Sequence, residues 1–218
     1  MKIAIDGTAA SGKGTLARRL AHNLACDYLD TGLLYRAVAL KASRQKLSSL
    51  GDNLKEQSQK ETIIKLTSIA FSLVLPISDS PDLRSQKISS LAAMVASLPE
   101  IRQALAEKQR SFANSPPSNK GAILDGRDIG SVILPEADFK FFIDAKPEIR
   151  AKRRFVELKD TNSNQTQETI LQDLIGRDKR DSTRQIAPLK RLSDAFFIDS
   201  SLLNADEVLQ IALNYING

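Results

Sequence analysis

Apolar residues occur in five short runs, most of them continuous, and each run ends in an aspartate. The runs cover residues 3–6, 28–30, 122–125, 139–144 and 196–199. A run that is apolar throughout, without alternating polar positions, is typical of a strand covered on both faces. Because helical patterns separate the runs, we predict an α/β fold in which a five-stranded parallel sheet carries helices on both faces.

The carboxyl ends of such strands are where parallel sheets bind their ligands, so we expect the chemistry to collect there. An aspartate at a strand end is also a common turn residue. We therefore interpret Asp6, Asp144 and Asp199 as turn-forming residues and assign them no catalytic role.

The first run leads directly into a segment with the spacing G-x-x-x-x-G-K. It consists of Gly7, Thr8, Ala9, Ala10, Ser11, Gly12, Lys13, Gly14 and Thr15. Glycines at both ends let the backbone wrap tightly, and the next helix, predicted from apolar residues at helical spacing, directs its positive dipole end at a bound anion. The segment therefore predicts a phosphate-binding loop for ATP, with Lys13 contacting the outer phosphates and a hydroxyl at Thr15.

Two segments interrupt the alternation of strands and helices. In the first, 41–114, we expect a helix over 62–67, a strand over 69–75 and a turn cluster over 76–82. A further helix follows, because apolar residues recur at i, i+3, i+4 and i+7 from Ile88, and Pro99 opens another helix. In the second segment, 159–188, a polar stretch over 160–167 precedes a helix rich in charge.

Three further groups of residues carry chemistry. Arg36 follows the second strand, and a phosphate ligand and an ordinary surface position are equally compatible with it. Arg127, flanked by carboxylates and glycines after the third strand, indicates a site, because a turn does not need this combination. Arg177, Asp181 and Arg184 share one predicted helix face; this is compatible with a solvated, ion-paired helix, but beside a phosphate loop it favours a lid.

Composition excludes several functions. With 31 basic and 26 acidic residues the net charge is +5, which suits anionic ligands. Nucleic-acid binding is not expected, because the chain has no Trp and its other aromatics fall mostly in apolar runs.

One cysteine, the lack of a signal peptide and the lack of a long apolar run predict a cytoplasmic protein without a membrane segment. A single histidine excludes a histidine-based triad, and 119–122 lacks the acid of a guanine-selecting motif.

The order of these motifs resembles the bacterial cytidylate kinases, which are nucleoside monophosphate kinases. The similarity extends over nearly the whole length and includes 7–15, 30–36, 84–86, 99–102, 125–130, 177–184 and 187–189. It implies a single phosphate-loop kinase domain over 1–218, with a monophosphate-binding insert at 41–114 and a lid at 159–188. It also implies transfer of the γ-phosphate of ATP to CMP or dCMP, with Mg²⁺ bridging the phosphates; we expect a monomer.

The resemblance also implies the roles of individual residues. The catalytic residues are Lys13, Arg127, Arg177 and Arg184, and Thr15 lies at the metal. The substrate is bound by Thr31, Arg36, Arg102, Arg127, Asp128, Arg177, Asp181 and Arg184. Among them, Arg36 and Arg127 hold the phosphate of the monophosphate, Arg102 and Asp128 recognise the cytosine, and Asp181 binds the ribose.

The chain departs from the family pattern at two places. Ala93 occupies the position at which the family commonly carries a serine that contacts the base, which indicates looser base selectivity. The family often has a small antiparallel sheet in the insert, whereas this sequence shows one clear strand there. Two alternatives remain: a phosphate-loop kinase with another acceptor, and a nucleotide-binding regulator without an acceptor.

Overall fold

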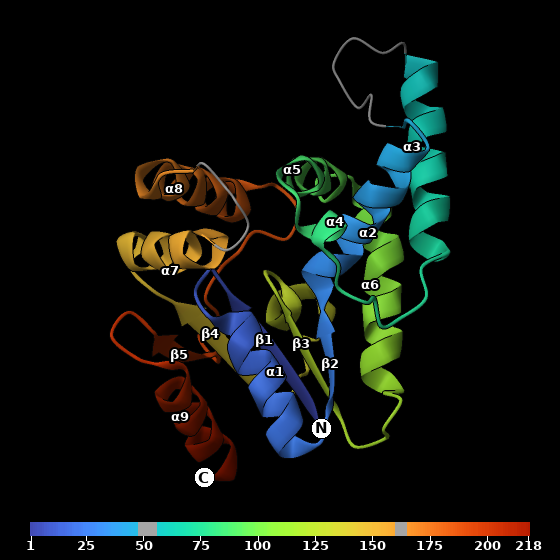
Figure 1. Ribbon diagram of the computed structural model, residues 1–218. Coiled ribbons are helices and arrows are strands. Elements are labelled where there is room, and N and C mark those ends of the chain that lie inside the picture. The colour runs from blue at the N-terminus through green and yellow to red at the C-terminus, as the bar shows by residue number, and fades with distance from the viewer. Residues whose placement is uncertain (48–55, 160–164) are drawn as a thin grey trace. The chain divides into compact units, whose positions relative to one another are not determined.

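The computed structural model describes residues 1–47, 56–159 and 165–218 (Figure 1). The chain forms two compact units. Unit 1 consists of Met1–Tyr28 and Pro116–Gly218, and unit 2 consists of Leu29–Ser115. The predicted insert, 41–114, falls within unit 2, and the predicted lid, 159–188, falls within unit 1. Residues 160–164 of the predicted polar stretch lie outside the described residues.

Within the described residues, five strands form one sheet in the order β2-β3-β1-β4-β5. The strands are β1 (Lys2–Gly7), β2 (Asp27–Asp30), β3 (Ala122–Gly126), β4 (Phe139–Asp144) and β5 (Phe196–Asp199). β1 pairs in parallel with β3 and β4, and β4 pairs in parallel with β5. The predicted five-stranded parallel sheet is confirmed, and the chain passes from unit 1 into unit 2 within β2.

Helices cover both faces of the sheet in unit 1. On one face, α1 (Lys13–Leu24) and α9 (Ala205–Asn217) pack onto a core that includes Ile3, Ile5 and Phe141. On the other face lies a short π-helix, η1 (Ile129–Ile133), which contacts β1. The alternation of side chains along a strand separates the two faces, because Phe142 packs with Leu189 on the side opposite to Phe141.

Two long helices of unit 1 lie side by side, α7 (Pro147–Lys159) and α8 (Gln167–Thr183) (Figure 1). Their shared apolar cluster contains Ala151 of α7, Ile170 and Leu174 of α8, and Ala9 of the predicted phosphate loop. α8 begins at a capping box in which the Thr166 side chain accepts a hydrogen bond from the Thr169 N–H and the Thr169 side chain accepts one from the Thr166 N–H. The predicted charged helix is thus confirmed, and it packs close to the loop.

Unit 2 is helical beyond the end of β2. Its helices are α2 (Thr31–Arg44), α3 (Glu56–Phe71), α4 (Pro81–Arg84), α5 (Gln86–Val95) and α6 (Pro99–Asn114). Pro99 is the first residue of α6, and the buried residues of α5 are the predicted Ile88, Leu91, Ala92 and Val95. The helix expected over 62–67 is part of α3.

The strand predicted over 69–75 is wrong, because α3 continues to Phe71 and no strand follows among the described residues of the insert. Leu66, Ile69, Ala70 and Leu73 are all buried, and their spacing of i, i+3, i+4 and i+7 is that of one helix face. In contrast, Val74 is 81% exposed. The apolar run therefore extends a helix face.

Among the residues that the structure describes, no helix combines the length and the apolar character needed to cross a lipid bilayer.

Candidate functional site

The segment between β1 and α1 has the geometry of a tight loop that only glycine permits at two positions. A Cβ on Gly7, where φ is +156°, would lie 2.0 Å from the Ile143 carbonyl oxygen of the neighbouring strand. Gly12 has a φ of 90° and caps α1, whose first residue is Lys13. Both glycines of the predicted motif are therefore required by backbone geometry.

Carbonyl oxygens of this loop accept hydrogen bonds from the surrounding protein. Arg150 Nη1 donates to the Ala9 oxygen at 3.1 Å, and Ser200 Oγ donates to the Ser11 oxygen at 2.8 Å. The buried Ser11 hydroxyl donates to the Thr8 oxygen at 3.0 Å. In a trans peptide the C=O and the following N–H point in opposite directions, so the bonds from Arg150 and Ser200 turn the next N–H groups away from the protein that holds the loop. N–H groups turned away from the surrounding protein fit the anion-binding loop that the sequence predicts.

The first turn of α1 lies against the end of β3. A Cβ on Gly14 would lie 3.3 Å from Asp125 Oδ2, tighter than most contacts of this kind. Asp125 is buried, and its Oδ1 accepts a hydrogen bond from the Tyr28 hydroxyl at 3.0 Å. Thr15, one residue further, is exposed. A glycine after Lys13 therefore leaves room for a carboxylate beside the loop.

Three arginines and two aspartates of unit 1 form a cluster that joins the end of β3 to α8. Arg127 Nε donates to Asp181 Oδ2 at 2.7 Å, and Arg177 Nε lies 3.9 Å from the same oxygen. Arg184 Nη2 lies 3.5 Å from Asp128 Oδ1. The structure thus brings together five of the predicted site residues, and the cluster keeps an excess of one positive charge.

Electrostatics within the cluster keep Asp181 ionised. Burial raises the pKa of this carboxyl, but the charges of Arg127 and Arg177, with the hydrogen bond from Arg127, outweigh burial and hold the pKa below its ordinary value. Asp181 therefore remains a carboxylate at neutral pH.

The predicted helix face of Arg177, Asp181 and Arg184 is correct for the first two residues only. α8 ends at Thr183, and Arg184 has an extended backbone with φ −62° and ψ 142°. The chain turns back here, because the Leu189 N–H donates to the Asp181 carbonyl oxygen at 2.8 Å. Arg184 reaches Asp128 from the first position beyond the helix.

Asp6 and Asp144 do more than the turn-forming role that we predicted for them. The buried Asp6 carboxylate accepts hydrogen bonds from the N–H groups of Ile129 and Gly130, both at 2.8 Å, and so holds η1 directly after Asp128. Burial raises the pKa of Asp6 to about 6, against the effect of those two bonds. Asp144 Oδ1 accepts a hydrogen bond from the Thr8 hydroxyl at 2.6 Å. Both aspartates bind segments far away in the sequence.

Unit 2 holds the remaining predicted site residues. Arg36 Nη1 donates to the Leu83 carbonyl oxygen and to Ser89 Oγ, both at 2.7 Å. The buried Arg102 donates to the Ala96 carbonyl oxygen at 3.2 Å, and its guanidinium lies 5.7 Å from the ring centre of Tyr35. Thr31, the first residue of α2, is buried. Ala93 is exposed on α5.

A second arginine of unit 2, Arg84, follows Leu83, whose carbonyl oxygen accepts the hydrogen bond from Arg36. Arg84 binds Asp79 at 2.7 Å and Asp30 at 3.3 Å. The hydrogen bonds from Arg84 lower the pKa of Asp79, and the charge of Arg36 contributes to the same shift. Arg84 therefore lies beside Arg36 at α4, and of these two arginines the sequence predicted a role only for Arg36.

Two residues that support the predicted phosphate loop were not identified from the sequence. Arg150 and Ser200 are 3% and 2% exposed, and each donates to a carbonyl oxygen of the loop. The only available signal for Arg150 was its spacing of i, i+3 with Arg153 on the helix after an aspartate-ended strand. Ser200 had none beyond its place next to Asp199.

Comparisons with known proteins agree with this geometry. A crystal structure of shikimate kinase from Bacteroides thetaiotaomicron is similar with a TM-score of 0.51 at 12% identity, and the match covers 100% of this chain and 99% of that one. At that identity the similarity supports the fold alone. It agrees with the α/β fold described above.

Sequence relatives are much closer. The cytidylate kinase of Paramagnetospirillum magneticum is 45% identical, covering 98% of this chain and 96% of that protein. The cytidylate kinase of Methylocella silvestris is 46% identical, covering 98% of this chain and 92% of its own length. The family model described as cytidylate kinase matches residues 3–218. With this match over nearly its whole length, the chain belongs to the cytidylate kinase family.

Proposed function

We propose that the protein transfers the γ-phosphate of ATP to CMP and dCMP, with ADP and CDP or dCDP as products. One observation carries the proposal: unit 1 combines a loop whose carbonyls are turned outward with a cluster of arginines that has an excess of positive charge. Phosphoryl transfer depends mainly on positioning and on electrostatic stabilisation, which these two features supply. Relatives over 40% identical that carry the name cytidylate kinase support the same reaction.

In this proposal, ATP is bound by the loop over residues 7–15, and Lys13 follows the phosphoryl group as it moves. Mg²⁺ accompanies ATP, and its positive charge helps to neutralise the transferring group. The Thr15 hydroxyl and the Asp125 carboxylate, which lies beside Gly14, are hard oxygen donors of the kind that Mg²⁺ accepts, directly or through water. These donors fit the ion, and the phosphates of the nucleotide supply further oxygens.

The acceptor nucleotide is proposed to be bound by the residues that the family resemblance implies. Arg36 and Arg127 hold its phosphate, because a planar guanidinium can bind phosphate oxygens in a bidentate manner. Thr31 also contacts the acceptor, and Asp181 binds the ribose. Arg177 and Arg184 stabilise the charge of the transferring group.

Arg102 and Asp128 are proposed to recognise the base. Cytosine presents a donor amine beside acceptors, so an arginine and a carboxylate together complement its edge. Uracil reverses part of that pattern and would leave a buried polar group without a partner, which makes discrimination steep. Ala93 removes one hydroxyl that the family commonly offers to the base, and this reduces the preference.

A panel of acceptors tests the proposal. Purified protein with Mg·ATP should release ADP rapidly with CMP or dCMP and slowly with UMP or AMP, as followed by a coupled assay for ADP. Equal rates across the panel would refute the proposal, and a preference for an acceptor that is not a cytidine nucleotide would indicate a different kinase.

Two substitutions separate the kinase from a nucleotide-binding regulator. Arg127→Ala and Arg184→Ala should each lower turnover on the order of 10³-fold, the scale for an arginine at a transferring phosphate. Arg154→Ala is the matched control, because Arg154 lies on α7 in an exposed pair with Glu157. Unchanged turnover in the first two variants would exclude the roles proposed for these arginines.

We also propose that the protein acts as a monomer in the cytoplasm. Its single cysteine, Cys26, is consistent with a reducing compartment. Light scattering after gel filtration should give the mass of one chain, 23.9 kDa.

A further inference from the structure

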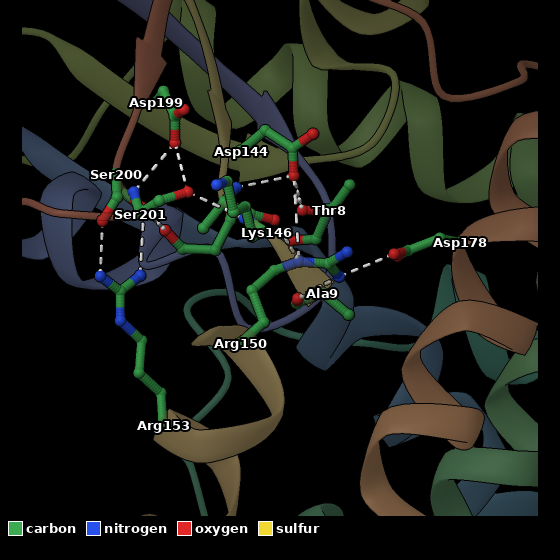
Figure 2. A network of polar contacts seen from close by, with 12 residues as sticks. Thr8, Ala9, Asp144, Lys146, Arg150, Arg153, Asp178, Asp199, Ser200 and Ser201 are labelled. Carbon is green, nitrogen blue, oxygen red and sulfur yellow. Dashed lines mark hydrogen bonds and ion pairs between the residues drawn. The ribbon is translucent and has the colours of Figure 1, made fainter. Parts of the chain in front are cut away.

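The phosphate loop is held from outside by a network that ends on α8 (Figure 2). At its centre is Arg150, on the first turn of α7, which is 3% exposed. It contacts three separate segments: Nε donates to the Ala145 oxygen after β4 at 2.8 Å, and Nη1 donates to the Ala9 oxygen of the loop at 3.1 Å. Nη1 also lies 2.7 Å from Asp178 Oδ2 on α8.

The contact with Asp178 connects the loop to the helix that bears part of the arginine cluster. Asp178 lies next to Arg177 in sequence and three residues before Asp181, within α8. Its second oxygen, Oδ1, is buried and accepts no hydrogen bond from the described residues. Arg150 is therefore the main partner of this carboxylate, and its guanidinium bridges α8 and the Ala9 carbonyl oxygen.

Apolar contacts between α7 and α8 do not require this arginine. Ala151, Ile170 and Leu174 already pack the two helices together with Ala9. A buried ion pair is weak grounds for stability, because desolvation of both charges offsets their attraction. The distinctive contribution of Arg150 is geometric. Its planar guanidinium fixes three acceptor oxygens relative to one another, whereas the ammonium group of a lysine cannot reach all three.

We infer that Arg150 is a positioning residue for phosphoryl transfer, and this inference rests on the proposed function. It turns the Ala9 carbonyl outward, so that the next N–H faces the ATP phosphates. Through Asp178 it also holds α8, and with it Arg177 and Asp181, at a fixed distance from the loop. In this inference Arg150 contacts neither substrate and acts through the protein oxygens that its Nε and Nη1 bind.

Arg150→Lys tests the inference, with Arg154→Lys as the matched control on an exposed position of the same helix. Both changes keep the positive charge. In Arg150→Lys we expect the Kd of ATP, measured by calorimetry without an acceptor, to rise about tenfold or more and kcat to fall up to about 100-fold, the scale of a displacement of 1 Å at a reacting group. The KM of CMP should change less than about threefold, and the control should match the wild type.

A second variant keeps the inference testable if Arg150→Lys does not fold. Asp178→Asn preserves the shape and one acceptor but removes the charge that binds α8 to Arg150. Its kcat should fall while its Kd of ATP stays near the wild-type value, because the Ala9 contact remains. The double variant should lose less than the two single losses combined, since both residues act in one chain of contacts.

A purely structural role predicts a different pattern, with a lower melting temperature and unchanged kinetic constants for the folded enzyme. That pattern, or an equal increase in the KM of ATP and of CMP in Arg150→Lys, would overturn the inference. If the wild type binds ATP but does not phosphorylate CMP, the proposed function fails. The comparison of ATP affinity between Arg150→Lys and Arg154→Lys then still tests the role of Arg150.

Discussion

Replacing Asp6 with asparagine should abolish a decrease in the free energy of unfolding that the wild type shows as the pH rises. In the folded protein, burial raises the pKa of Asp6 from 3.8 to about 6, although two backbone N–H groups donate to it. Between these pH values the unfolded chain has released the proton and the folded chain retains it, so the free energy of unfolding falls as the pH rises. At about 1.36 kcal/mol per pKa unit, this carboxyl accounts for a fall of roughly 3 kcal/mol.

The measurement is urea unfolding of the wild type and of Asp6→Asn at several pH values from about 4 to about 7. Asparagine occupies the same volume but does not titrate. Other carboxyls are common to both proteins, so the difference in free energy of unfolding, wild type minus variant, should decrease by roughly 2.5 kcal/mol across this range, since the rest of the fall lies below pH 4. It should become level only about one pH unit above the folded-state pKa, where Asp6 is ionised in both the folded and the unfolded state.

Asp199→Asn is the control for a strand-end aspartate. Asp199 is exposed, and hydrogen bonds from Ser201 lower its pKa. Its contribution to stability is present at neutral pH and is lost as the pH falls, so the difference between wild type and this variant should change in the opposite direction. A difference between wild type and Asp6→Asn that stays constant within about 0.5 kcal/mol over the whole range would refute the reasoning about Asp6.

Three further substitutions test the loop and the specificity of the site. Gly7→Ala should destabilise the protein by roughly 4 kcal/mol or more, because the new Cβ would lie 2.0 Å from the Ile143 oxygen; a wild-type melting temperature would contradict this. Asp128→Ala should impair the use of CMP while sparing ATP binding, as seen in separate KM and Kd values; equal losses for both nucleotides would make Asp128 structural. Ala93→Ser should increase the ratio of kcat/KM for CMP over UMP about fivefold, the scale of one hydrogen bond, and an unchanged ratio would speak against a contact with the base.

Local patterns in the sequence were sufficient to predict much of the fold. Strand ends, the first helix and the loop depend on neighbours within a few residues, and each lies where the pattern placed it. The strand predicted over 69–75 failed because a short apolar run fits both a buried strand and a helix face. Only the burial of Leu66 and Leu73 on one side of the chain decides between the two.

The residues that support the loop could not be predicted from local patterns in the sequence. Arg150 and Ser200 are buried because they bind loop oxygens that lie 141 and 189 residues away in the sequence. An arginine in the first turn of a charged helix has the same local pattern whether it faces solvent or a carbonyl group. Its role therefore depends on tertiary contacts that no spacing encodes.

The aspartates at the strand ends can be recognised in the sequence, but their hydrogen-bond partners cannot. Each of three carboxylates binds a segment from the neighbouring strand in the order β2-β3-β1-β4. Tyr28 of β2 donates to Asp125 of β3, the segment after β3 donates to Asp6 of β1, and Thr8 after β1 donates to Asp144 of β4. These bonds join adjacent strands at the edge where the site forms, and so preorganise it. The sequence reveals that each run ends in an acid, but the partner of each acid follows from the strand order, because neighbours in the sheet are distant in the chain.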